Sequence, residues 1–244
     1  MIRKLMICPW FGALPPWFDQ YLANIELLKP YGYDWLITTN LNLFKQRVGD
    51  LLGIKCPIEH GTGKVWDYRA CLGVLFEEEV KHYDYFGHAD FDCVFGRIDH
   101  FMPDMNLCRY DIWSNHADVA EPYGGYICGP WTLYRNGVVV CGLTTIDGPE
   151  RIADLFRRHG SWREILERPE PTGWVEFQDG YTGIVDQAHK KHEVERIYTM
   201  HQTKDLNNFS TLQLDSDGTL YEGGVERMMA HFRRKKEWPL KESL

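Results

Sequence analysis

Three short apolar runs, separated by stretches with helical periodicity, constrain this chain more than any other feature. Each run has the length of a buried strand, and in each intervening stretch apolar residues recur every three or four positions, as on one face of a helix. This alternation predicts a mostly parallel sheet covered by helices on both faces. The predicted strands are residues 4–8, 33–40 and 83–88, and the predicted helices are residues 15–28, 41–52 and 64–81.

The second half of the chain has a more mixed pattern. No Gly/Ser-rich or Pro-rich linker divides the sequence, so we expect residues 1–244 to form a single α/β domain with a Rossmann-like central sheet and a mixed C-terminal half. Further strands are predicted at 110–114, 126–134 and 193–200, further helices at 149–158 and 162–166, and a hairpin over 212–221.

Charge and cysteine usage narrow the class of protein. The net charge of −8 disfavours a nucleic-acid binder, because such proteins usually carry a basic face. The seven cysteines include no Cys-x-x-Cys pair, which favours buried, reduced thiols in a cytoplasmic protein. No apolar run has the length of a signal peptide or of a transmembrane helix, so we expect any membrane contact to be peripheral.

An Asp-x-Asp motif, Asp90-Phe91-Asp92, follows the third predicted strand. On an extended strand, carboxylates two positions apart point the same way and could hold one hard divalent cation. The pattern alone is common by chance, and a second copy at 215–217, before Gly218, is typical of a hairpin turn. Position favours the first copy, because ligands bind outside the carboxyl ends of the strands in open α/β sheets. Residues 9–12 and Asn40 follow the other two strands, so three strand ends are expected to converge on one crevice.

Ordered motifs along most of the chain resemble those of GT-A glycosyltransferases, and in particular a small bacterial and phage-type group of sugar transferases. The resemblance implies a GT-A-like fold with a nucleotide-sugar-binding half, residues 1–100, and an acceptor-side half, residues 101–244. It also implies a nucleotide-diphosphate sugar donor, most simply UDP-linked, and Mn²⁺ or Mg²⁺ as cofactor. The motifs are Pro-Trp-Phe-Gly-x-x-Pro-Pro-Trp-Phe at 9–18, Lys-x-x-Asp-Tyr-Arg at 64–69, Gly-His-Ala-Asp-Phe-Asp-Cys-Val-Phe-Gly at 87–96, Leu-Tyr-Arg-Asn at 133–136, and Ala-His-Phe-Arg-Arg-Lys-Lys at 230–236.

The resemblance also assigns roles to individual residues. An imidazole ligand would favour Mn²⁺ over Mg²⁺. Asp186 is the candidate acceptor-side catalytic group, with Asp179 as a competitor. The metal ligands would be Asp90, Asp92 and His231, and the donor-binding residues would be Trp10, Phe11, Gly12, Asn40, Lys64, Asp67, Arg69, Asp90 and Lys236.

Each assignment has a plainer structural alternative. Trp10 and Phe11 could pack in the core, and Asn40 could cap the next helix. Lys64 and Asp67, three positions apart, could form a surface ion pair. His231 could be an ordinary partly buried histidine, and the basic run 233–236 could be a solvated tail.

Three functions remain open from the sequence. The first is metal-dependent sugar transfer to a hydroxyl acceptor, for which the late His-plus-Lys motif resembles retaining families. The second is a nucleotidyltransferase, although residues 9–12 lack the Gly-rich loop that such an enzyme needs. The third is a non-catalytic module that binds nucleotide sugars. The acceptor is open as well, and candidates are a glycan, a lipopolysaccharide, a small molecule or a modified nucleobase.

Overall fold

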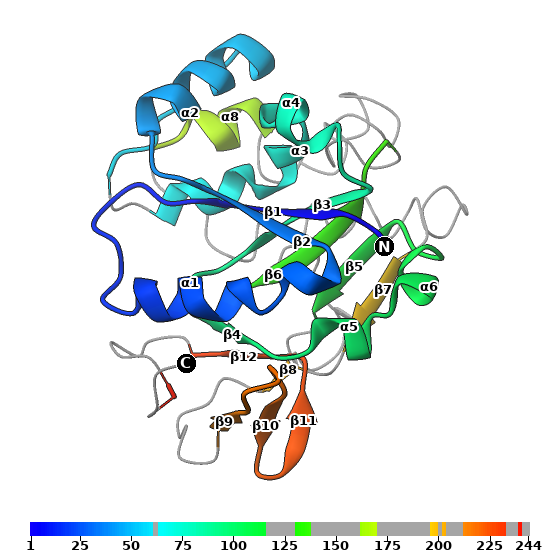
Figure 1. Cartoon of the computed structure of the whole chain (residues 1–244). Helices are drawn as coiled ribbons and strands as arrows, with labels where there is room; N and C mark the ends of the chain where they lie inside the picture. The colour runs from blue at the N-terminus through cyan, green and yellow to red at the C-terminus, as the bar shows by residue number, and fades with distance from the viewer. Residues whose placement is uncertain are drawn as a thin grey trace, which may run out of the picture.

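A six-stranded sheet forms the centre of the molecule (Figure 1). The structure is a computed structural model that describes residues 1–60, 63–115, 130–137, 162–169, 196–199, 202–203, 212–232 and 239–240. The strand order is β2-β1-β3-β6-β5-β7. The strands are β1 (Lys4–Pro9), β2 (Tyr33–Thr38), β3 (Tyr85–Ala89), β5 (Ile112–Asn115), β6 (Trp131–Arg135) and β7 (Arg196–Thr199).

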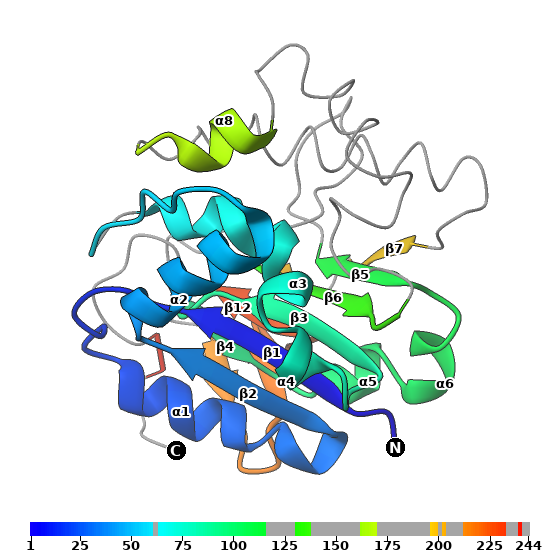
Figure 2. The ribbon, with the colours of Figure 1, turned by 90° about the horizontal axis from the view of Figure 1, so that it is seen from above.

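Five of these six strands point in one direction. β1 pairs in parallel with β2 and β3, which lie beside it in Figure 2, and β7 pairs in parallel with β5. Only β6 runs the other way, antiparallel to both β3 and β5. The predicted mostly parallel sheet is therefore confirmed, whereas the reversed direction of β6 was not anticipated.

Helices cover both faces of the sheet, as the alternation along β1 requires (Figure 1). Leu5 and Ile7 join one buried cluster, whereas Met6 and Cys8 join the other, because successive side chains of a strand point to opposite faces. The first cluster includes residues of α2 (Leu41–Arg47), α3 (Leu72–Leu75), α4 (Glu77–Val80) and α8 (Trp162–Glu167). The second includes residues of α1 (Phe18–Glu26), α5 (Ile98–Phe101) and α6 (Asp104–Leu107).

The segment predicted as one helix over 64–81 is helical but broken. It consists of a 3₁₀ helix, η3 (Gly63–Cys71), followed by α3 and α4. The break falls at Phe76, whose backbone angles, φ −123° and ψ 32°, are not those of an α-helix. The carbonyl of Leu75 instead accepts a hydrogen bond from Arg47 Nη1 of α2, at 2.9 Å. A single α-helix was therefore the wrong prediction, since a neighbouring helix supplies a donor that periodicity cannot reveal.

Two three-stranded sheets lie on the side of the central sheet that α1 covers (Figure 1). One has the order β4-β12-β8, from β4 (Cys93–Phe95), β12 (Met229–His231) and β8 (Gln202–Thr203). The other is formed by β9 (Leu212–Leu214), β10 (Leu220–Glu222) and β11 (Val225–Arg227). The predicted hairpin at 212–221 is confirmed, and Gly218 has the positive φ of 83° that its turn requires.

Other expectations are matched within a few residues or lie outside the described chain. The helix at 41–52 is α2 continued by a π-helical turn, η2 (Val48–Leu52), and a short 3₁₀ turn, η1 (Lys29–Tyr31), precedes β2. The helix predicted at 149–158 lies outside the described residues, as do 126–129 of the predicted strand. Of the five described cysteines, none is in a disulfide and only Cys108 is exposed. Within the described part of the chain, no helix is both long and apolar enough to cross a membrane.

Arg47 is expected to stabilise the broken segment through Glu79. Its guanidinium donates to both carboxylate oxygens of Glu79, and this hydrogen bond, opposed by desolvation, lowers the pKa of that carboxyl. Because the pKa is lowered on folding, the stabilisation is present above the unfolded pKa of about 4.3 and is lost as pH falls through the folded value. We expect Glu79→Gln to lower the free energy of unfolding by about 1 kcal/mol at neutral pH and by much less near pH 3. Urea denaturation across this pH range measures the difference. Glu78→Gln, in an exposed pair with Lys81, is the matched control and should change little at either pH.

Candidate functional site

A cavity of about 300 Å³ lies where β1 and β3 end. Its wall includes Trp10 after β1, Asp90 and Asp92 after β3, Arg69 from η3, and His231 from β12. Two of these four elements, β1 and β3, are strands whose ends were expected to converge; Asn40, after the third such strand, is not in the wall. The described part of the chain also has a larger hollow, of about 670 Å³, at the opposite ends of these strands, but no predicted site residue lines it.

The two carboxylates of the Asp-x-Asp motif turn to different partners. β3 ends at Ala89 and β4 begins at Cys93, so residues 90–92 form a connection and not an extended strand. Asp90 pairs with the guanidinium of Arg69. Asp92 Oδ1 instead lies 3.2 Å from Nε2 of His231. The expectation that both carboxylates point the same way does not hold, because the chain turns between them.

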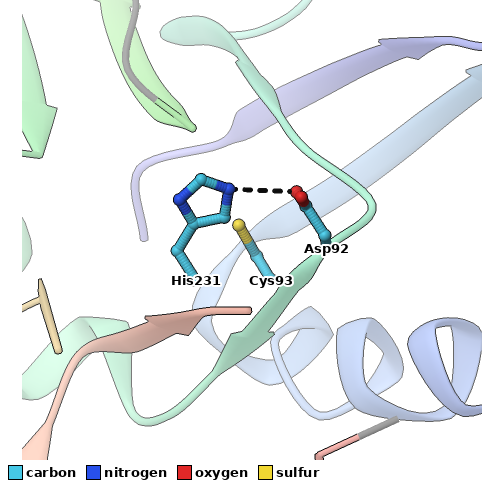
Figure 3. A group of neighbouring side chains, drawn as sticks. All are labelled: Asp92, Cys93 and His231. Atoms are coloured by element: carbon cyan, nitrogen blue, oxygen red, sulfur yellow. Dashed lines mark ion pairs between the residues drawn. The ribbon is translucent and has the colours of Figure 1, made fainter. Parts of the chain in front are cut away.

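His231 reaches Asp92 because β12 pairs antiparallel with β4. In this register His231 lies opposite Cys93, and the N–H of Phe232 donates to the carbonyl of Asp92 at 2.9 Å. Figure 3 shows the three side chains of Asp92, Cys93 and His231 converging. One ligand atom from each lies within 4.8 Å of the others, which makes this a candidate metal centre. Asp90 is not part of that group.

Contact with His231 favours the ionised form of Asp92. Burial by itself would raise the pKa of this carboxyl, but the hydrogen bond from His231, its charge and the more distant Arg69 outweigh burial and lower the pKa. Asp92 is therefore an anion at neutral pH, as a metal ligand must be. Burial raises the pKa of the Cys93 thiol well above its ordinary value, and the nearby carboxylates add to this effect.

Aromatic side chains hold the connection between β3 and β4 in place. Phe91, between the two aspartates, is buried against Trp10 at 5.2 Å, Phe18 at 5.6 Å and Tyr21 at 4.9 Å between ring centroids. Trp17 Nε1 donates to the carbonyl of Phe91 at 2.9 Å. The motif is thus fixed by its middle residue, and its flanking carboxylates project from an anchored turn.

Tryptophan also lines the cavity, and sequence reasoning missed two of these residues. Trp17 and Trp66 lie in the wall with Trp10. Trp66 is 43% exposed, unusual for so large an apolar side chain, and its ring lies 5.9 Å from the Arg69 guanidinium. The available signal for Trp66 was its position in the Lys-x-x-Asp-Tyr-Arg motif, two residues after Lys64. Cys93 was missed too, although it directly follows the second aspartate.

Several predicted donor-binding residues do not line the cavity. Phe11 is buried in the core against Phe44, with ring centroids 5.0 Å apart. Asn40 accepts the N–H of Leu43 at 3.0 Å and so caps α2. Gly12 lies in the exposed bend after β1. For Phe11 and Asn40, the geometry is that of the plainer alternative.

Lys64 and Asp67 form an ion pair of 2.8 Å, with side chains 0% and 6% exposed. The alternative of a surface ion pair is therefore wrong, because the pair is buried. Neither residue is in the cavity wall. Asp186, its competitor Asp179 and Lys236 lie outside the described residues, so their assigned roles stay predictions.

The contribution of the buried Lys64–Asp67 pair should be measurable as a change in the free energy of unfolding. We expect Lys64→Met to lower the free energy of unfolding by about 3–5 kcal/mol, because it leaves the Asp67 carboxylate buried without its cation. The double variant Lys64→Met/Asp67→Leu should recover most of this loss, since both charges are then absent. Chemical denaturation of both variants measures the coupling. Equal stability of Lys64→Met and the unchanged protein would contradict a buried structural pair.

Comparison with known proteins places the chain in a family. It belongs to the family described as "Family of unknown function (DUF6625)", whose sequence model matches residues 35–237. No curated protein sequence matches the chain.

Among solved structures, the chain is similar to the "crystal structure of a glycosyltransferase involved in the glycosylation of the major capsid of PBCV-1". The TM-score is 0.51 at 11% identity, over 96% of this chain and 95% of that chain. A second solved structure, A197 from STIV, aligns over 91% of this chain and 94% of that chain at 14% identity, with a TM-score of 0.35. The first likeness shows a glycosyltransferase-like fold with a mixed central sheet.

Proposed function

We propose that this protein is a metal-dependent glycosyltransferase that moves a sugar from a nucleotide-diphosphate donor, most simply UDP-linked, to a hydroxyl acceptor. One observation carries the proposal. At the strand ends of a glycosyltransferase-like fold, Asp92 and His231 face the same cavity as Arg69. An anionic metal ligand, an imidazole and a guanidinium together suit a cation and a diphosphate.

The donor set fits a divalent cation. Asp92 and His231 would hold it, with Mn²⁺ favoured over Mg²⁺ because an imidazole nitrogen takes part. When bound, such a cation neutralises charge on the diphosphate leaving group. Asp90 takes part through Arg69: its carboxylate holds the guanidinium at the cavity wall, where the guanidinium can donate to phosphate oxygens.

The tryptophans supply flat apolar surfaces for the rest of the donor. Trp10 is tied down by a hydrogen bond from its Nε1 to the carbonyl of Ala13, at 2.9 Å. Trp66 is the exposed ring of the wall and is available to stack on a nucleobase or a sugar ring. In this arrangement Trp10 supports the motif through Phe91, whereas Trp66 contacts the ligand.

The acceptor side rests on the resemblance. Asp186 is proposed to orient or deprotonate the acceptor hydroxyl, and Lys236 to contact the diphosphate. Retention of configuration is favoured by the late His-plus-Lys motif.

Loss of Asp92 tests the proposal directly. We expect Asp92→Asn, or EDTA added to the unchanged protein, to lower the rate of UDP release from UDP-sugars by about 100-fold or more, because the diphosphate then lacks its counter-charge. Asp215→Asn is the matched control: it removes an exposed carboxylate from the second Asp-x-Asp copy, which is not part of the cavity wall, and should leave the rate unchanged.

That assay, together with parallel measurements on other substrates, separates the rival functions. Unchanged UDP release by Asp92→Asn would refute the proposal. Release of pyrophosphate from a nucleoside triphosphate and a sugar phosphate would identify a nucleotidyltransferase. Saturable binding of a UDP-sugar with Mn²⁺ but no turnover, over a panel of acceptors, would identify a binding module.

A further inference from the structure

The thiol of Cys93 lies beside the Asp92 carboxylate and the His231 imidazole (Figure 3). We propose that Cys93 is the third protein ligand of this metal centre, so that the site prefers a borderline transition-metal ion such as Zn²⁺ or Co²⁺ and discriminates against Mg²⁺. This inference deepens the metal site of the proposed function and rests on that site, but it does not require sugar transfer.

Strand pairing places the thiol. Cys93 and His231 are directly opposite each other in the antiparallel β4–β12 pair, and such residues project from the same face of the two strands. Asp92 immediately precedes Cys93 along the chain. Two ligands therefore come from hydrogen-bonded strands and the third from the adjoining anchored turn. Zinc bonds of about 2.0–2.3 Å draw ligand atoms to within about 4 Å of one another, so the present spread of up to 4.8 Å needs only a small side-chain adjustment.

Differences in exposure give the centre an open side. Cys93 is fully buried, His231 is nearly so, and the Asp92 side chain is 32% exposed. Asp92 and His231 line the cavity, whereas the fully buried Cys93 is not part of its wall. An ion held by all three would thus have its remaining positions toward the cavity, as in catalytic zinc sites with three protein ligands. On binding, the thiol would release its proton to solvent and coordinate as thiolate.

The donor set decides the choice of ion. Mg²⁺ prefers oxygen ligands in octahedral geometry and keeps its waters, so sulfur and nitrogen serve it poorly. Zn²⁺ and Co²⁺ accept carboxylate, imidazole and thiolate together. A centre of Asp90, Asp92 and His231 would instead be richer in oxygen, and Asp90 is engaged by Arg69. Participation of Cys93 therefore distinguishes a centre of Asp92, Cys93 and His231 from one of Asp90, Asp92 and His231.

The competing role for Cys93 is core packing, since it belongs to the buried cluster that contains Cys8 and Tyr21. Cys8 is also buried in this cluster, yet it is not in the candidate ligand group. Cys8→Ser is thus the matched control for Cys93→Ser: both replace a buried thiol by a hydroxyl in the same cluster.

The test is titration of the metal-free full chain with Co²⁺, followed by absorption spectroscopy without any donor. We expect the unchanged protein and Cys8→Ser to show a near-ultraviolet thiolate-to-cobalt charge-transfer band, and Cys93→Ser to lack it. Competition with Zn²⁺ should show an affinity loss in Cys93→Ser of at least about tenfold, the loss typical of even an outer-sphere partner, while weak Mg²⁺ binding is unchanged. Near-ultraviolet circular dichroism establishes that each variant is folded.

Each outcome has one meaning. Cobalt binding without the band in the unchanged protein, a band that survives in folded Cys93→Ser, or no binding of Co²⁺ or Zn²⁺ overturns the proposal. Should Cys93→Ser not fold, Cys93→Ala and the band of the unchanged protein decide instead. A thiolate band in a protein without sugar turnover would leave this inference standing and remove the proposed function; metal-dependent turnover without the band would do the reverse.

Discussion

The pairing of β12 with β4 is the constraint on which the candidate site depends. It joins a strand near the end of the chain to the strand that follows the Asp-x-Asp motif, and its register sets His231 against Cys93 and beside Asp92. The N–H of Phe232 and that of Gly96 extend the same ladder, donating to the carbonyls of Asp92 and Met228. A shift of one residue would move the imidazole to the other face of β12, since successive side chains alternate. The chemistry of the cavity is therefore a consequence of backbone register.

Much of the fold could be predicted because its causes are local. The runs that became β1, β2 and β3 are short and apolar, and the expected ends lie within two residues of those observed. The direction of β6 could not be predicted, since both parallel and antiparallel neighbours bury the same apolar side chains. The break at Phe76 was equally hidden, because the donor that satisfies the Leu75 carbonyl is Arg47, on another helix. Periodicity reports which face is buried and not which backbone hydrogen bonds are exchanged.

The location of the site residues in the fold could be predicted better than the side chains that each of them contacts. The strand ends predicted the common location of Trp10, Asp90 and Asp92, whereas Arg69 and His231 were named only through the family resemblance; all five share one cavity wall. Phe11 and Asn40 also follow strand ends but do not line the cavity. Phe11 packs in the core, and Asn40 caps α2. Spacing of two suggested one shared cation for the aspartates, but the turn separates them into an ion pair with Arg69 and a contact with His231. Partner choice depends on tertiary neighbours that a motif does not contain.

The middle residue of the Asp-x-Asp motif, Phe91, has a structural role that the motif as written does not specify. The middle position, written as any residue, is here a buried ring packed against Trp10, Phe18 and Tyr21, with its carbonyl held by Trp17. A smaller side chain would leave a void among these rings and loosen the turn that carries both carboxylates. In evolutionary terms, position 91 is coupled to an aromatic neighbourhood drawn from the first strand end and the first helix. Substitutions at position 91 are thus expected to be accompanied by compensating changes in its aromatic neighbours.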